Sequence, residues 1–248
     1  MNKIFLLFVI AGFSLTQGTP NFVTINQLLA ASNQVRANPS ILVPIFENEF
    51  KAFMNCNGNN GANQSLNATT LHTGWGLNIQ EGCAGLNEAI NDANNRVKYP
   101  IVPPLKIDEG LTEVAHEQSV YQVSLGVYNP TSQTYTNSVL SHFGPPNVAG
   151  QVAKYSLGDR IKIRNNQYFV KTRENIIDSR GGFSHTALRI IAFLFLDAGL
   201  PSRGHRVNLL SGDVHYIGIG IHPFTVSGLP RDKITLQYGN VAACCRIG

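Results

Sequence analysis

The order of helical and alternating segments in this 248-residue chain predicts an α+β fold. Apolar residues recur with a helical period through most of the first half, whereas polar and apolar residues alternate at 160–172 and again near the C-terminus. The segments do not follow a repeated β-α-β order, so a sheet with antiparallel pairs is expected. An apolar content of 43% and a charged content of 14% suit one folded chain with a substantial core.

The first helices are marked by capping and proline signals. Thr24-Ile25-Asn26-Gln27 has the form of a capping box, and the helix that follows should end by Asn38, because Pro39 disfavours a helical residue before it. A second helix is expected over 41–53, with Pro44 near its start, where proline is tolerated. A weaker helical pattern covers 85–95.

Two later helices are also predicted. Asp108 can cap a helix with an apolar stripe that ends at Gly126, and His116 and Glu117 lie off that stripe, so both are expected to be solvated. Ser184 can cap a helix over 185–198. Its residues 188–196 are apolar on nearly every side, which indicates the most buried helix of the protein.

Strands are expected in two pairs. Residues 160–164 and 168–172 alternate around two asparagines and predict a small hairpin. Residues 216–221 and 233–238 predict a second pair of strands. Within the first of these, Gly218 and Gly220 would let another backbone or a helix lie close against the sheet.

The N-terminus predicts secretion. Residues 1–18 have the form of a signal peptide, with Lys3, an apolar run and small residues before a cleavage point after Gly18. The alternative is an uncleaved anchor, but the apolar run is short of the roughly 20 residues a spanning helix needs. Residues 19–248 are then expected to form a single domain, without a transmembrane segment. The net charge of +4, or +3 without Lys3, is too small and scattered for a nucleic-acid partner.

Four cysteines are expected to form two disulfides in a secreted chain. Of three pairings, a bond between the adjacent Cys244 and Cys245 is least expected, because it strains the geometry. We expect both to reach back to Cys56 and Cys83, which flank an Asn/Gly-rich insertion at about 55–85. Two glycosylation sequences lie in this insertion, at Asn63 and Asn67, which predicts a glycoprotein.

Three short stretches, far apart in the sequence, contain side chains that can bind a metal or transfer protons. They contain His142, Glu174 and His205. Two imidazoles and a carboxylate are the minimum set for a small metal site or for acid/base work. The alternative is that the three side chains hold neighbouring loops together by hydrogen bonds.

Five motifs in order resemble the CAP superfamily in its SCP-like extracellular form. They are Asn-x-x-Arg-Ala-Asn-Pro (33–39), Ser-His-Phe-Gly (141–144), Glu-Asn-Ile (174–176), Gly-His-Arg-x-Asn-Leu-Leu (204–210) and Ile-Gly-Ile-Gly (217–220). The resemblance runs from about Ile25 to Tyr238 and implies a three-layer α-β-α sandwich. It also implies a central cleft with two histidines and two acids.

The resemblance assigns the cleft residues one at a time. His142 and His205 match the family histidines and Glu174 matches one acid, although Phe143 and Arg173 depart from the family pattern. The second acid has no clean counterpart, and Asp197 is the nearest one in position.

The function expected from this resemblance is a secreted, non-catalytic CAP-domain protein. Its cleft would bind zinc or another divalent metal through His142, His205 and Glu174, and its partner would be an extracellular protein or a lipid. One alternative is a metal-dependent hydrolase or peptidase with Glu174 as the base. Another is a sterol or lipid carrier.

Overall fold

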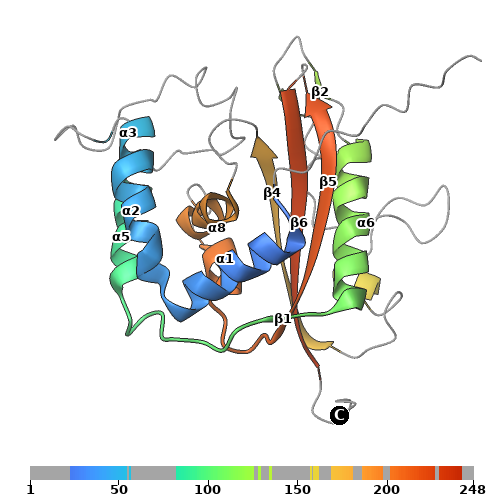
Figure 1. Ribbon diagram of the computed structural model, residues 1–248, viewed down its shortest axis with the longest axis horizontal. Coiled ribbons are helices and arrows are strands. Elements are labelled where there is room, and N and C mark those ends of the chain that lie inside the picture. Colours follow the sequence, from blue (N-terminus) through green and yellow to red (C-terminus); the bar gives the residue numbers. More distant parts are fainter. Residues whose placement is uncertain are drawn as a thin grey trace, which may run out of the picture.

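A computed structural model gives the arrangement of the chain (Figure 1). The residues that the structure describes are 23–54, 56, 82–125, 128–129, 134–135, 157, 159–161, 169–180, 186–197, 202–226 and 229–241. The predicted signal peptide, both glycosylation sequences, His142 and the two C-terminal cysteines lie outside these residues.

A four-stranded mixed sheet lies at the centre of the described fold, with the strand order β1-β5-β6-β4. The strands are β1 (Lys106–Ile107), β4 (Phe169–Arg180), β5 (Tyr216–Val226) and β6 (Leu229–Val241). β1 pairs with β5 in parallel, and the other two pairings are antiparallel. Two short strands, β2 (Tyr128–Asn129) and β3 (Thr134–Tyr135), pair separately. The mixture of helices with this sheet confirms the α+β prediction.

Most described helices lie on one side of the sheet (Figure 1). They are α1 (Ile25–Ala37), the helical turns η1 (Pro39–Leu42), α2 (Val43–Ile45), η2 (Phe46–Phe50) and α3 (Lys51–Phe53), and then α5 (Gly82–Asn94), α8 (Ala187–Leu196) and α9 (Gly204–Leu209). The capping box at α1 is confirmed, since the Thr24 and Gln27 side chains each accept a hydrogen bond from the other residue's backbone N–H.

The main apolar core fills the space between these helices and the sheet. Helix α8 is buried from Ile190 to Leu196, as its apolar composition predicted. Aromatic rings of α8 and η2 pack together, with Phe50 and Phe193 centroids 4.4 Å apart. On the sheet, the core receives Ile217, Ile219 and Ile221.

Helix α6 (Glu109–Leu125) covers the opposite face of the sheet. Asp108 caps it as predicted, since the Asp108 carboxylate accepts a hydrogen bond from the Leu111 N–H at 2.8 Å. The alternate residues of β5 that point toward α6 are Gly218 and Gly220. A Cβ atom at Gly218 would lie 2.0 Å from the carbonyl carbon of Leu111, and one at Gly220 would lie 2.2 Å from that of Ala115. The glycines therefore permit the close packing that the sequence predicted.

The predicted hairpin and the predicted cysteine pairing are wrong. Arg160 and Ile161 are helical, so the predicted first strand does not begin at Arg160, and β4 extends to Arg180 instead of ending at Thr172. The structure pairs Cys56 with Cys83, with their Cα atoms 5.6 Å apart, so these cysteines do not pair with Cys244 and Cys245. The bond closes the Asn/Gly-rich insertion across its own two ends.

We expect Gly218→Ala to destabilise the protein by about 3 kcal/mol, because the added methyl group would overlap the backbone of α6 and force the helix off the sheet. Urea unfolding followed by circular dichroism measures this. Gly212→Ala is the matched control, since its Cβ would meet its nearest neighbour, Val102, at an ordinary 3.5 Å. Equal stability of the two variants would contradict this account of the packing.

Candidate functional site

The turn between α8 and α9 positions two of the residues that the sequence singled out. Asp197 ends α8 in the left-handed conformation, with φ of 49°, which aspartate tolerates better than most residues. Its buried carboxylate then turns toward the start of α9 and accepts a hydrogen bond from the His205 N–H at 2.8 Å. The predicted fourth acid and His205 therefore meet.

The imidazole of His205 is oriented by the same carboxylate. Nδ1 of His205 lies 2.8 Å from Oδ1 of Asp197. Because an ionised carboxylate only accepts hydrogen bonds, Nδ1 carries the proton, and Nε2 is the lone-pair nitrogen of the neutral ring. The His205 side chain is 21% exposed, whereas that of Asp197 is fully buried. Carboxylate–histidine pairs of this kind orient imidazoles that bind metals.

Glu174 does not join them. Successive residues of a strand point to opposite faces of a sheet, and the Glu174 carboxylate accepts hydrogen bonds from Arg160 at 2.8 Å and from Gln237 at 3.0 Å. Gln237 pairs with Gly218, which faces α6. Glu174 therefore lies on the α6 face, and the prediction that it shares one hollow with His205 is wrong.

The neighbouring residue, Asn175, points to the other face and connects β4 to α9. Its side-chain amide donates to the His205 carbonyl at 3.1 Å and accepts from the Asn208 side chain at 2.8 Å. Asn208 also donates to the Glu174 carbonyl at 3.2 Å. Sequence reasoning missed this role, although both asparagines lie within the Glu-Asn-Ile and Gly-His-Arg-x-Asn motifs that it quoted.

Arg206 anchors α9 in the core. Its side chain is fully buried, and its guanidinium donates to the carbonyl groups of Phe195 and Leu196 at 2.6 and 2.9 Å. It also contacts the carboxylates of Asp92 and Glu88 on α5. Arg206 thus stabilises the end of α8 and binds it to α5.

Arg36 performs a similar task from α1. It is fully buried, and its guanidinium donates to the carbonyl groups of Pro103, Leu209, Ser211 and Val214 at 2.7–3.2 Å. Burial lowers the pKa of Arg36 to about 10, so the side chain is still protonated at neutral pH. Hydrogen bonds from Arg36 therefore join the first sequence motif (33–39) directly to the fourth (204–210).

The described residues do not fit the predicted three-ligand metal centre. Within the described ranges, no group of three or more His, Cys, Asp or Glu side chains is arranged to hold a metal ion. Glu174 lies across the sheet from His205, and His142 lies outside the described residues.

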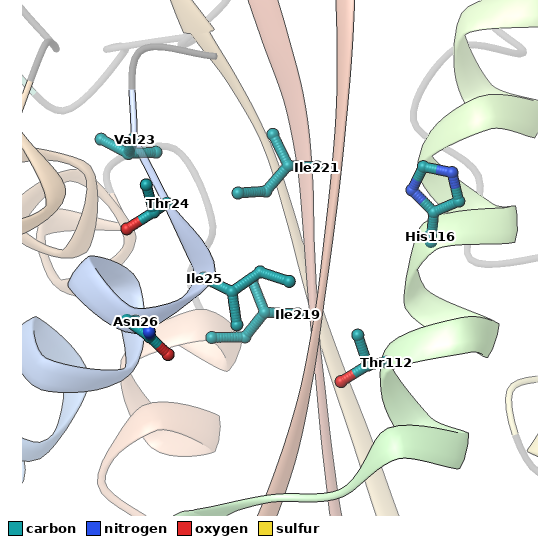
Figure 2. Close-up of a pocket in the computed structure, with 8 residues that line it drawn as sticks. All are labelled: Val23, Thr24, Ile25, Asn26, Thr112, His116, Ile219 and Ile221. Atoms are coloured by element: carbon teal, nitrogen blue, oxygen red, sulfur yellow. The ribbon is translucent and has the colours of Figure 1, made fainter.

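A separate groove lies beside β5, and none of the described site residues Glu174, Asp197 and His205 lines it (Figure 2). Its volume is about 520 Å³. We call it the edge groove; among the described residues its lining comprises Val23, Thr24, Ile25, Asn26, Thr112, His116, Ile219 and Ile221. His116 is exposed on α6, as expected, but it forms part of this wall.

Within the described part of the chain, no helix has the length and apolarity needed to cross a membrane.

Comparisons with known proteins do not assign a family. No protein-family model matches the chain, and no curated protein matches it. Among solved structures, the chain is similar to an outer surface protein from Borrelia burgdorferi, with 20% sequence identity and a TM-score of 0.36. That similarity covers 57% of this chain and 80% of the other. A likeness this distant carries no statement about function.

We expect the ion pairs that hold α9 to make stability fall in acid. Hydrogen bonding from Arg203, together with the nearby charge of Arg206, lowers the pKa of Glu88 to about 2. In the unfolded chain this carboxyl group titrates near its ordinary value of about 4.3. Ionised Glu88 therefore contributes stability above about pH 5, and that stability is lost as the pH falls toward 2.

Glu88→Gln tests this by urea unfolding at several pH values. We expect the native protein to exceed the variant by roughly 1 kcal/mol at pH 7, a modest figure because the Glu88 side chain is 39% exposed. The difference should close between pH 5 and 2. Glu113→Gln, on the exposed side of α6, is the control and should show no such change. A difference that does not vary with pH would contradict the mechanism.

Proposed function

We propose that this chain is a secreted, non-catalytic binding protein with a CAP domain of the SCP-like type, built as a three-layer α-β-α sandwich. The order of the five sequence motifs supports the proposal. So does the way the described motifs contact one another: Arg36 reaches the Gly-His-Arg segment, and Asn175 of the Glu-Asn-Ile segment donates to His205. Arg36, Asn175 and His205 then serve to hold the motif segments together in one scaffold.

The separation of Glu174 from His205 carries the non-catalytic assignment. A general base must lie within hydrogen-bond reach of the group that it deprotonates, and a hydrolytic centre needs that base beside its metal or nucleophile. The Glu174 carboxylate is buried on the α6 face and paired with Arg160. Asp197 is engaged with the backbone and ring of His205. Glu174 is therefore not positioned to act as the base of a hydrolytic centre at His205.

Divalent-metal binding is assigned to two imidazoles, those of His205 and His142, without Glu174. The support is the Asp197–His205 pair, because it leaves Nε2 of a neutral His205 as a ligand nitrogen. Zinc is the natural probe, because imidazole nitrogen is among its preferred ligands. The physiological partner is an extracellular protein or a lipid.

Titration calorimetry of the full protein with zinc tests this assignment. We expect His205→Ala and His142→Ala each to weaken zinc binding at least tenfold, because each removes one ligand. His215→Ala is the matched control: His215 is also half-buried, and its Nδ1 lies 3.0 Å from Oδ1 of Asn240. Its zinc affinity should stay within twofold of the native protein.

Circular dichroism must show that each variant is folded before the titrations are compared. Unchanged zinc binding in both His205→Ala and His142→Ala would overturn the metal assignment. Hydrolysis of peptides that is lost in Glu174→Gln would overturn the non-catalytic one.

A further inference from the structure

Two histidine rings meet where α6 packs against β5. His116 lies on the side of α6 nearer the sheet (Figure 2), and His222 lies within β5. The centroids of the two imidazole rings are 6.1 Å apart, and the ring planes are inclined by 70°. Neither residue belongs to the cleft assigned above, so this pair needs an explanation of its own.

The glycines of β5 account for this approach. A Cβ atom at Gly220 would lie 2.3 Å from the backbone nitrogen of His116, so the helix backbone rests directly on the strand at this point. His222 follows Gly220 by two residues and therefore projects from the same face of the sheet. The distance between the two imidazoles is thus set by backbone packing between a helix and a strand, and not by a loop.

Both rings have ring nitrogens available for a ligand. Within the described part of the chain, neither imidazole has a hydrogen-bond partner. His116 is exposed and His222 is half-buried, so the pair can be reached from solvent. Burial, together with the proximity of His116, lowers the pKa of His222, which favours a neutral ring at neutral pH. In its neutral form, each imidazole offers one lone-pair nitrogen.

The separation of the rings suits one shared metal ion. Zinc lies about 2.0–2.1 Å from an imidazole nitrogen that binds it, and the ring centroid lies roughly 1.2 Å behind that nitrogen. The centroids of two rings on one ion are therefore about 5.2 Å apart for a tetrahedral angle at the metal and about 6.4 Å apart for a linear one. The observed 6.1 Å lies within these limits. A small rotation of the exposed His116 ring would bring the angle closer to tetrahedral.

The neighbouring charges admit a cation at this place. Lys233 lies opposite His222 in β6, but it is buried and paired with the Asp178 carboxylate, which offsets its charge. Glu113 is exposed on α6 one turn before His116, so its carboxylate adds negative charge on that side of the rings. A divalent ion between the imidazoles would therefore not face an uncompensated positive charge from these neighbours.

We propose that His116 and His222 together bind one divalent transition-metal ion, of which zinc is the representative, between α6 and β5. Imidazole nitrogen suits zinc, copper and nickel, whereas calcium and magnesium prefer oxygen ligands. Two protein ligands leave the other positions of the ion to water. No carboxylate among the described residues orients either ring as Asp197 orients His205, so we expect weaker binding here than in the cleft. The site shares no ligand with the cleft and is independent of the proposed function.

NMR of the imidazole nitrogens, on the full native protein labelled with ¹⁵N, tests the site with zinc alone as the probe. We expect the ring-nitrogen signals of His116 and His222 to shift together, with one shared dissociation constant in the micromolar range. The signals of His215 should not change, because its Nδ1 already lies 3.0 Å from Oδ1 of Asn240. The signals of His142 and His205 appear in the same spectra, so failure of the cleft assignment would be seen separately.

Titration calorimetry on the His142→Ala/His205→Ala variant measures the pair without the cleft. Adding His116→Ala should weaken the remaining zinc binding at least tenfold, because it removes one of two ligands from an exposed position that the fold does not need. Adding His222→Ala should have the same effect. Adding His215→Ala instead is the matched control, and zinc affinity should then stay within twofold. Circular dichroism establishes that each variant is folded.

Three results would overturn the proposal. One is that the ring signals of His116 and His222 stay unchanged even at millimolar zinc. Another is that the two rings shift with different dissociation constants, which would mean that each binds a separate ion. The third is that His116→Ala, folded by circular dichroism, leaves zinc binding of the His142→Ala/His205→Ala variant unchanged.

Discussion

Two buried guanidinium groups hold together the part of the molecule on which the site depends. Among the described residues between the end of α8 and the start of β5, the short helix α9 is the regular element, so many carbonyl groups there have no partner in regular structure. Arg206 binds the carbonyls that end α8, and Arg36 reaches those of Leu209, Ser211 and Val214. A buried carbonyl without a partner costs about 1–3 kcal/mol. The planar fork of arginine satisfies several at once. These bonds hold the end of α8, which carries Asp197, and the helix α9, which carries His205.

The parts of the fold that the sequence predicted correctly are those decided by local chemistry. The capping box at Thr24 and the cap at Asp108 need only neighbouring residues to form. Helix α8 is apolar on nearly every side, so the sequence required it to be buried within a core. Gly218 and Gly220 indicated a close neighbour, although the sequence did not say that the neighbour would be α6.

The wrong predictions concern features that depend on contacts between residues far apart in the sequence. Glu174 and Asn175 are adjacent in a strand, and which of them faces α9 depends on the register of β4 against β6, since a shift of one residue exchanges the two faces. Residues 160–164 alternate like a strand, yet Arg160 lies in a helical turn where its guanidinium reaches Glu174. Cysteine pairing likewise depends on which ends of the chain meet in space, and spacing alone left three choices.

The two faces of the sheet differ in chemistry. The face toward α1 and α8 is an apolar core, whereas the face toward α6 carries buried polar contacts, such as Ser119 donating to the Gly220 carbonyl at 3.2 Å and lying 2.9 Å from the Thr235 hydroxyl. At the edge of β5 the two chemistries meet, because the edge groove takes its apolar wall from Ile219 and Ile221 on one face and its polar wall from Thr112 and His116 on the other.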